Sequence, residues 1–579
     1  MRIAIPALLC LTWIGVSSAQ TPTGAISGVV SDPSGGGVAG ALVRIASRST
    51  GLDRKISTSA QGDYSFAALL PGEYEVSVEA TGFERVARAA VVEAGITTST
   101  DFKLIVGDVK QSVNVDAATP QMQYDSHTLG GVVTQNQIEG LPLNGRNFLE
   151  LAKLEPGTQP PSPSNNNRVF VPVLGAPGGN TGSGGRGTRV TVDGGSIMAV
   201  GSFGSQMGFS QEVVQEFQVS AANFDLSTGT TDAGAINVVT RSGGNDFHGA
   251  AFYFFRDHTL SAYPALARDP ANPDPFFQRR QFGLAAGGPI RHDRVFFFAN
   301  WERNEQRGVV DSNLLDPDFA HFSRIMTNPL FGDQFSVRLD ARISDRQTVF
   351  VRHSHDGSRA FAPSPSTGNP MAYPSQWTRQ SAWTDQSLMG LTSVLQPTLV
   401  NDVRLSYFFS STAETAPEEQ DCSGCLGIGA PAINIQQSSL FIGNSSSDSN
   451  LGRRFHLSDM ITWQRSTHRV RFGAEWEYNR GGILGWVNEP ATLTLWSPAQ
   501  ARQYNIPVPD AFRTIGDILQ LPLQNVVVSV GDPRVPQQGG GNVRHWPTAR
   551  LYVQDTWRVR SGVTVNYGLG WEIESGSQL

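Results

Sequence analysis

Cys422 and Cys425 are the residue pair whose spacing most resembles a chemical site, in the segment Asp-Cys-Ser-Gly-Cys. A redox Cys-x-x-Cys pair needs a helix start beside a β-α-β pattern, and a zinc site needs a second pair of ligands. The surrounding sequence offers neither. In an oxidising compartment such a pair forms a small loop disulfide. The sequence therefore favours this disulfide, or two unpaired thiols, over redox or zinc chemistry.

Two further groups of residues resemble chemical sites without completing one. His353, His355 and Asp356 could supply metal ligands, but a fourth ligand is missing, and a solvated rim explains the group better. The glycine-rich stretch 175–187 lacks the Gly-Lys-Ser/Thr ending of a phosphate-binding loop and runs into a strand. Since nothing resembles a catalytic constellation, the sequence predicts that the chain is not an enzyme and holds neither a metal nor a cofactor.

The length and charge of the chain narrow its class. At 579 residues the chain is too long for one ordinary domain, so at least two or three units are expected, each with its own core. It carries 44 Lys and Arg against 51 Asp and Glu, which gives a formal net charge of −7. Because these charges are mixed, with no basic patch or run, nucleic acid is not an expected partner.

Residues 1–19 have the features of a signal peptide. Arg2 precedes an apolar run from Ile3 to Val16, and small residues precede a cut between Ala19 and Gln20. A membrane-spanning helix needs about 20 apolar residues, more than this run supplies, so we expect export and cleavage. No later segment is apolar for about 18 residues, so passage through a membrane would require a β-barrel.

Residues 24–106 have the pattern of a small β-sandwich. Short alternating segments recur about every 10 residues and are separated by turns that contain Gly and Pro. These segments are Ala25–Val30, Ala41–Ile45, Gly62–Phe66 and Tyr74–Val78. A metallopeptidase would need His and Glu zinc ligands, and this stretch contains no histidine, so it is not expected to be catalytic.

Residues 107–245 contain a polar kink between two helix-like stretches. Pro142 cannot continue a helix, and the Asn144-Gly145 pair tolerates positive φ, so a fixed turn is expected. Arg146 brings a permanent charge to this turn, and we expect it to have a bonded structural role. The whole kink consists of Leu141, Pro142, Leu143, Asn144, Gly145, Arg146 and Asn147.

Two strand-like segments follow the kink. The first covers residues 189–192 and ends at Asp193 and Gly194, and the second covers residues 235–240. The Asp-Gly pair is typical of a tight turn. Together with the helix-like stretches, these strands predict an α+β domain.

Residues 246–579 alternate between apolar and polar side chains. In Gln334–Ile343 every odd position is apolar and every even position is polar, and other segments repeat the pattern. Strands of about 9 to 11 residues are long enough to cross a bilayer when tilted. Eleven such strands are expected, starting near residues 247, 281, 294, 333, 348, 386, 402, 455, 469, 549 and 563.

The links between these strands favour a membrane barrel over a soluble sandwich. Outer-membrane barrels have tight periplasmic turns that alternate with large external loops. Eleven is an odd number, and half a barrel leaves two unpaired edges in lipid, so the sequence indicates a chain truncated within the barrel. Short links such as 291–294 alternate here with long links over 304–332, 356–385, 411–453 and 480–547.

The order of these regions resembles a TonB-dependent outer-membrane receptor of the Oar-like kind, with an N-terminal carboxypeptidase regulatory-like domain. The resemblance implies a mainly β protein of the cell outer membrane: a β-sandwich over 24–106, an α+β plug over 107–245 and the first half of an antiparallel β-barrel over 246–579. The motifs that carry it are the kink 141–147, Val192–Gly194, Glu212–Gln218, Gly234–Gly243, Asn245–Gly249, Gln281–Gly283, Gly287–Ile290 and Tyr552–Trp557.

The resemblance also implies partners. A TonB-type energy-transducing protein in the periplasm would act on a short segment before the plug, for which a plain linker strand is the alternative. Outer-membrane lipid would surround the barrel, and the ligand would be an oligosaccharide, a peptide or a chelate. The candidate coupling residues are Val106, Gly107, Asp108 and Val109.

Two functions remain open at this point. The leading hypothesis is energy-coupled transport of a ligand across the outer membrane. The alternative is surface assembly, adhesion or carbohydrate binding through the external loops. A passive porin is disfavoured because a plug would block free diffusion.

Overall fold

The chain folds mainly as β-sheet, which confirms the predicted class. Within the described part of the chain, no helix is long and apolar enough to cross a membrane. The predicted cleavage site at Ala19 and Gln20, the coupling candidates Asp108 and Val109, and Asn144 of the kink lie outside the described residues. The computed structural model describes residues 23–107, 113–114, 128–143, 145–156, 158–159, 173–174, 188–198, 200, 207–223, 225–229, 234–261, 274–312, 314, 316–363, 373–436, 438, 440–444, 448–485, 491–528, 543–560 and 563–575.

Residues 23–107, here called the N-terminal domain, form two sheets around one apolar core. Side chains from both sheets, such as Ile26, Val43, Phe66 and Val76, are fully buried in that core. One sheet contains β4 (Asp63–Leu69), β1 (Gly24–Ser31), β7 (Thr97–Ser99) and β8 (Phe102–Lys103). The other has the order β3 (Leu52–Ser57), β2 (Leu42–Ser47), β5 (Gly72–Glu79), β6 (Val86–Val92) and β9 (Val113–Asn114), the last strand lying just beyond the domain.

A second unit, here called the inner domain, combines a mixed five-stranded sheet with short helices. Its core includes Phe148 and Phe217, whose ring centroids are 5.6 Å apart, and also Phe298 and Phe408 from the neighbouring sheet. The sheet has the order β10 (Thr128–Val133), β15 (Val214–Asn223), β16 (Gly234–Thr240), β13 (Thr188–Val192) and β14 (Gly195–Ser196). Around it lie α1 (Gln135–Gly140), η2 (Phe148–Leu154), η4 (Gln211–Val213), η5 (Leu226–Thr228) and the pair β11 (Thr158–Gln159) and β12 (Val173–Leu174).

The third unit is an antiparallel sheet of eleven strands in chain order, here called the wall. Each predicted strand corresponds to one of them, and β17 and β31 are the two edges. The strands are β17 (His248–Asp257), β18 (Phe277–Arg291), β19 (Val295–Ser312), β20 (Arg324–Ser344), β21 (Gln347–Pro363), β22 (Trp377–Gln396), β23 (Leu399–Thr415), β26 (Asp448–Arg465), β27 (His468–Gly485), β30 (Arg544–Arg560) and β31 (Val563–Glu574).

The predicted strand length of about 9 to 11 residues was wrong for most of the wall. The strands run from 10 residues in β17 to 21 in β20. They continue past the alternating segments because each keeps its hydrogen-bonded neighbour there, as in the pairing of Arg324 with Ser312. Much of the predicted long links is therefore strand, and the tight turns, such as Ser344–Gln347, all lie at the other end.

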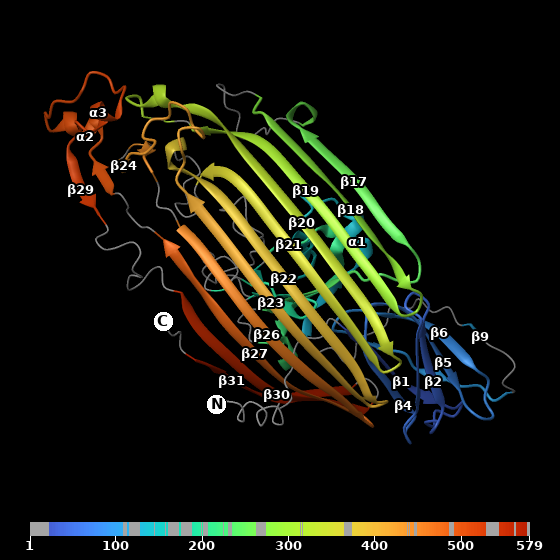
Figure 1. Ribbon diagram of the computed structural model, residues 1–579. Helices are drawn as coiled ribbons and strands as arrows, with labels where there is room; N and C mark the ends of the chain where they lie inside the picture. The colour runs from blue at the N-terminus through green and yellow to red at the C-terminus, as the bar shows by residue number, and fades with distance from the viewer. Residues whose placement is uncertain are drawn as a thin grey trace, which may run out of the picture.

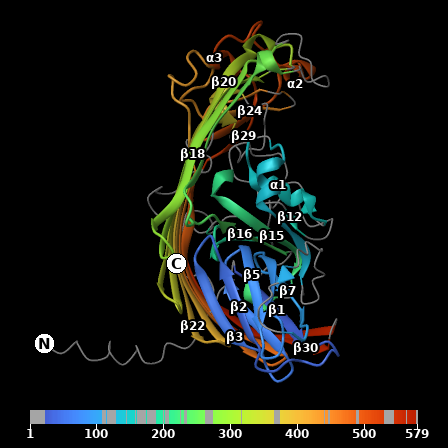
Figure 2. The ribbon, with the colours of Figure 1, turned by 90° about the vertical axis from the view of Figure 1, so that its right-hand side faces the viewer.

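The alternation gives the wall two chemically different faces. In β20 the Val337 and Leu339 side chains are exposed, whereas Ser336 and Arg338 between and beside them are buried. The wall is curved, and both the inner domain and the N-terminal domain lie against one of its faces (Figure 2). The N-terminal domain lies at the end of the wall where the tight turns are (Figure 1). The polar face therefore contacts protein, and the apolar face is left for lipid.

The long connections fold into a small unit of their own, here called the cap. Its core joins residues from four connections, including Phe319, Tyr373, Ile433 and Phe512. Its sheet has the order β25 (Phe441–Ile442), β24 (Ala432–Ile435), β28 (Thr492–Leu495) and β29 (Leu523–Val527). Its helices are α2 (Pro498–Gln503) and α3 (Ile515–Ile518), and the single turns η6 (His258–Leu260), η7 (Ala320–Phe322) and η8 (Pro374–Gln376) lie in the connections.

The prediction of long loops over 411–453 and 480–547 was therefore wrong in part. Strand β24 pairs in parallel with β28, which comes from a different connection, and alternation along the chain does not reveal such pairing. The cap lies beyond the strand ends opposite the N-terminal domain (Figure 1).

Candidate functional site

The kink carries its charge into the space between the inner domain and the wall. Gly145 has φ 88° and Arg146 has φ 58°, so two successive residues adopt the left-handed conformation and turn the chain sharply. The Arg146 guanidinium lies 2.9 Å from Glu212 and 3.5 Å from Glu302 of β19. It also lies 4.0 Å from the ring centroid of Phe252 in β17. The kink therefore links the inner domain to the wall through a partly desolvated cation.

A second arginine extends this network toward α1. Arg241 follows β16 and pairs with Glu139 in α1, and its other terminal nitrogen lies 3.8 Å from Glu212. Glu212 is thus shared between Arg146 and Arg241. Charges of alternating sign run from α1 to the wall, and this chain of contacts would change if the inner domain moved.

The Asp193-Gly194 turn supplies a second ionic contact. Both residues have positive φ, 50° and 88°, and Asp193 is only 1% exposed. Its carboxylate accepts hydrogen bonds from the Thr240 N–H at 2.9 Å and the Thr240 hydroxyl at 2.7 Å. It also pairs with Arg338 at 3.3 Å and Arg352 at 2.8 Å, from β20 and β21.

The protonation of Asp193 follows from these contacts. Burial raises the pKa of an isolated carboxyl, but the guanidinium groups of Arg338 and Arg352, with the two hydrogen bonds from Thr240, outweigh burial and lower the pKa of Asp193. The carboxylate is therefore charged when the two domains are in contact. The Arg404 side chain of β23 also donates to the Asp193 carbonyl oxygen, so three wall arginines converge on one turn.

The third ionic contact between the inner domain and the wall is made by β13. Arg189 is 3.0 Å from Glu477 and 3.8 Å from Glu475, both in β27. Arg454 of β26 lies 3.5 Å from Glu477 and also donates to the Ser196 hydroxyl at 2.9 Å. Ion pairs and a hydrogen bond therefore connect the wall and the inner domain here as well.

One group at this contact has the geometry of a metal site. The ligand atoms of His456, Glu475 and Glu477 lie within 4.8 Å of one another. Arg189 and Arg454 already pair with Glu477, and their positive charges disfavour a bound cation. The arrangement therefore favours an ion-pair cluster over a metal centre.

Close packing accompanies the charges. A Cβ added to Gly195 would lie 2.6 Å from Leu388 of β22. Val200 lies over two wall glycines, because a Cβ at Gly452 or Gly481 would come within 2.8 or 2.7 Å of its side chain. The inner domain thus approaches the wall backbone directly at these positions.

Contacts also join the N-terminal domain to both other units. The Ala94 N–H donates to the Glu216 carboxylate of β15, and burial raises the pKa of Glu216 to about 7. The Asn245 N–H donates to the Ser49 carbonyl at 2.8 Å, and Arg342 of β20 donates to the Gly51 carbonyl at 2.6 Å.

The remaining sequence candidates lie apart from these contacts. Cys422 and Cys425 form a disulfide with a Cα–Cα distance of 5.5 Å in the core of the cap. Val106 is 69% exposed and forms an isolated bridge to Phe83, and the Gly107 N–H donates to the Gly82 carbonyl at 3.3 Å. The start of the coupling candidate thus runs beside the N-terminal domain.

The histidine group is not assembled as a metal site. His355 bonds to Asp385 at 2.8 Å, and its ring lies tilted against Trp383, with a centroid distance of 4.3 Å. Asp356 points to the other face of the wall and accepts the Gly208 N–H at 2.6 Å. The alternation of the strand separates adjacent residues in this way.

The wall partners of the inner domain were not identified from the sequence. Arg338, Arg352 and Arg404 occupy even positions of alternating strands, which assigns them to the polar face. The sequence indicates only that adjacent strands carry inward-facing arginines. It does not identify their partners, because the pairs join residues far apart in the chain, such as Asp193 and Arg338, which are 145 positions apart.

Family models match most of the chain. The model described as outer membrane beta barrel domain matches residues 239–320 and 311–578. The model described as carboxypeptidase regulatory-like domain matches residues 25–105. The first match covers the wall, and the second covers the N-terminal domain.

Individual relatives are transporters and receptors, and none of those named below is an enzyme. The chain is 28% identical over 262 residues to the TonB-dependent transporter Oar of Myxococcus xanthus, which covers 43% of this chain and 24% of that protein. The structure is similar to the outer membrane transporter YddB from Escherichia coli, with TM-score 0.55, 12% identity, and coverage of 78% of this chain and 57% of that one. The siderophore receptor PirA from Acinetobacter baumannii matches with TM-score 0.47 and 15% identity, over 79% and 58% of the two chains. The chain thus spans about a quarter of the curated relative and over half of the solved structures.

Proposed function

Because this chain belongs to the outer membrane β-barrel family, with relatives among the TonB-dependent transporters, we propose that it takes part in energy-coupled passage of a ligand across the outer membrane. It is an outer-membrane protein. In this proposal the N-terminal domain is a periplasmic β-sandwich, the inner domain is a plug, and the wall is part of the barrel around it.

The observation that carries the proposal is the ionic contact between the inner domain and the wall. Arg146, Asp193 and Arg189 each enter an ion pair with a wall residue, at three separate places. Apolar packing alone would make a permanent core, whereas polar pairs can exchange for water when the domain is displaced. Such a contact suits a domain that blocks a passage at rest and is moved by applied force.

The force would enter through the segment from Val106 to Val113. Val106 is exposed, and the segment leads from the N-terminal domain to β9, which precedes β10 of the inner domain along the chain. An extended segment can add as a strand to a partner's sheet edge, which provides a mechanical attachment without a large interface. A TonB-type energy-transducing protein of the periplasm is the proposed partner, and Val106, Gly107, Asp108 and Val109 are the proposed contact residues.

Deletion of residues 106–113 tests this proposal. In cells that express the chain, accumulation of candidate oligosaccharides, peptides and iron chelates is measured with and without collapse of the inner-membrane gradient. The unaltered chain should accumulate one of them only with the gradient, and the deletion should stop accumulation while surface binding persists. Replacement of the segment by Gly and Ser of equal length is the control for spacing and should also stop accumulation. Uptake that continues unchanged in the deletion would refute coupling through this segment.

Surface binding is the second candidate function, and the cap favours it. Trp496 and Tyr504 lie in the cap with ring centroids 5.3 Å apart, and Tyr504 is 66% exposed. Exposed aromatic rings provide flat apolar surfaces for stacking on a ligand, including the apolar faces of a sugar. Binding that persists and has no gradient-dependent uptake in any variant would select adhesion or carbohydrate binding over transport.

A further inference from the structure

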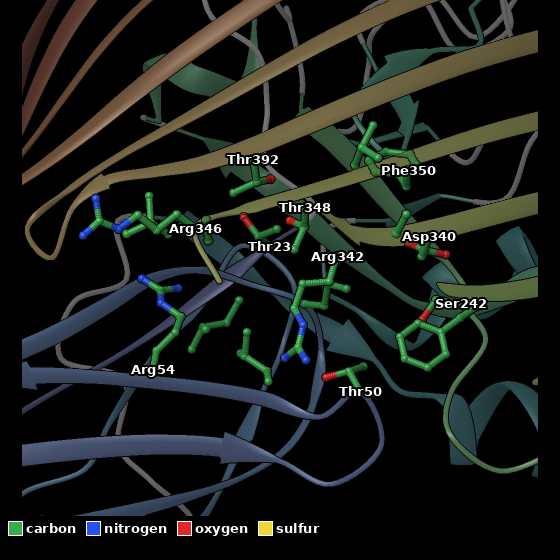
Figure 3. A pocket seen from close by; sticks show the side chains of 18 of the residues that line it. Thr23, Thr50, Arg54, Ser242, Asp340, Arg342, Arg346, Thr348, Phe350 and Thr392 are labelled. Atoms are coloured by element: carbon green, nitrogen blue, oxygen red, sulfur yellow. The ribbon is translucent and has the colours of Figure 1, made fainter. Parts of the chain in front are cut away.

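A cavity of about 110 Å³ lies where the N-terminal domain meets the wall near its tight turns (Figure 3). Most of its lining is apolar. Leu52, Leu69 and Tyr74 come from the N-terminal domain, and Phe350 and Val394 come from the wall. An apolar cavity of about 150 Å³ is large enough to hold benzene, so this smaller one accepts a compact apolar group of fewer carbon atoms, such as a short alkyl chain.

The cavity is also lined by more arginines than carboxylates. Arg338 and Arg404 are compensated by aspartates, as described above for Arg338. Within the described residues, no carboxylate lies within ion-pair distance of Arg54, Arg342 or Arg346. Asp345 is the one remaining carboxylate of the lining, so these three guanidinium groups leave the cavity with an excess of positive charge.

Arg54 is the arginine that the N-terminal domain contributes. Its guanidinium donates to the Ala67 carbonyl at 3.0 Å and lies 5.7 Å from the ring centroid of Phe66. Burial lowers the pKa of Arg54 to about 10, because the neighbouring groups do not compensate its charge. A bound anion would supply that compensation.

The arginines approach the cavity from two units. Figure 3 shows Arg54 rising from the N-terminal domain toward the wall, with Arg346 on the wall above it and Arg342 pointing down toward Thr50. Arg342 points away toward Thr50 and donates to the Gly51 carbonyl, whereas Arg54 uses only one terminal nitrogen in its bond to Ala67, so Arg54 and Arg346 retain N–H groups that can bind a ligand. The two belong to β3 and to the turn between β20 and β21.

We propose that this cavity binds a small organic carboxylate, with the carboxylate on Arg54 and Arg346 and a compact apolar body between Leu52, Tyr74 and Phe350. The planar guanidinium group matches a carboxylate through two parallel hydrogen bonds. Because the two arginines belong to different units, the bound carboxylate ties the N-terminal domain to the wall. This site is independent of the proposed transport, since neither arginine belongs to the contacts of the inner domain.

Calorimetric titration of the detergent-extracted chain with butyrate, a carboxylate with a short alkyl chain, tests the proposal. Butyrate should bind, and both R54Q and R346Q should weaken its binding at least tenfold. K55Q, which removes an exposed charge from the same strand, should leave binding unchanged. No binding of butyrate, or equal binding by R54Q, R346Q and the unaltered chain, would overturn the proposal.

Two further probes separate the carboxylate from its apolar body. 1-Butanol has a similar alkyl chain without the charge, and inorganic phosphate has a negative charge without the chain. Both should bind at least tenfold more weakly than butyrate, and equal binding of either would overturn the assigned ligand class. If R54Q does not fold, R346Q decides the outcome, because Arg346 is an exposed turn residue whose loss leaves the core intact.

Discussion

The Asp193 carboxylate balances the positive charges of two wall arginines. Its charge should therefore contribute more to stability than its size. Asp193→Asn keeps the shape but leaves Arg338 and Arg352 without their shared counter-charge. Breaking one side of a buried ion pair costs about 3–5 kcal/mol. We expect a loss of that size in the free energy of unfolding, measured by denaturant titration of the detergent-solubilised chain.

An exposed pair provides the control for that substitution. Asp53 pairs with Arg44 at 2.7 Å, but the two side chains are 42% and 38% exposed. Asp53→Asn should therefore cost less than about 1 kcal/mol. Equal losses for the two variants would show that Asp193 is not an anchor of the inner domain.

Glu216 makes the contact between the N-terminal domain and the inner domain depend on pH. Burial raises its pKa to about 7 in the folded chain, above the ordinary value of 4.5, so the folded state binds a proton that the separated state releases. The contact should thus be strongest below about pH 4.5 and weaken as pH rises through about 7. Hydrogen exchange of the segment around Ala94 at pH 5 and pH 8 measures the change.

Glu216→Gln should remove that pH dependence, since the amide oxygen can still accept the Ala94 N–H and does not titrate. Glu73→Gln removes an exposed carboxylate from β5 of the N-terminal domain and should leave the dependence as it was. A pH profile that survives in Glu216→Gln would assign the dependence to another group.

At the scale of elements, the kink depends on its glycine. Gly145 has φ 88°, and an added Cβ would meet only the flexible end of Arg279 at 3.3 Å, so the cost of a side chain lies in the backbone. Gly145→Ala should destabilise the chain by about 1–2 kcal/mol. Gly140→Ala is the control, because Gly140 ends α1 with open space around it. A lowered melting temperature for Gly145→Ala alone is the expected result, and equal melting temperatures would contradict it.

The sequence predicted the elements of the wall better than their ends. Alternation in segments such as Gln334–Ile343 identifies a strand with one polar and one apolar face, and the structure has all eleven. The ends were not predictable, because pairing continues where alternation stops. Parallel pairing of β24 with β28 was missed for the related reason that it joins separate connections.

The candidate site was predicted only by residue type. The Arg146 charge and the Asp193-Gly194 turn are evident in the sequence, and their positive φ values agree with the expected turns. Their partners are not evident, since Glu212 is 66 positions from Arg146 and comes from a different element. Charge complementarity across such distances becomes visible only when the strands are in register.

At the scale of the whole molecule, the cap should unfold separately from the wall. Phe512 is 1% exposed and contacts Phe319 with a centroid distance of 5.0 Å. Phe512→Ala should destabilise the cap by about 3–5 kcal/mol, while the wall keeps its own hydrogen-bonded ladder. Limited proteolysis of intact cells should then cleave between residues 491 and 528. Tyr504→Ala, at an exposed position of the same segment, should not change the cleavage.

The two wall glycines beneath Val200 affect how the inner domain would move along the wall under force. At Gly452 and Gly481 the wall presents backbone and no side chain to Val200. No side chain there can interlock with the inner domain. If the inner domain were pulled along the strands, it would meet little steric resistance at these two glycines. The resistance would come from the ion pairs, which act over only a few ångströms. The contact between the inner domain and the wall would resist displacement up to a threshold force. Once the ion pairs break, the inner domain would move along the wall with little further resistance.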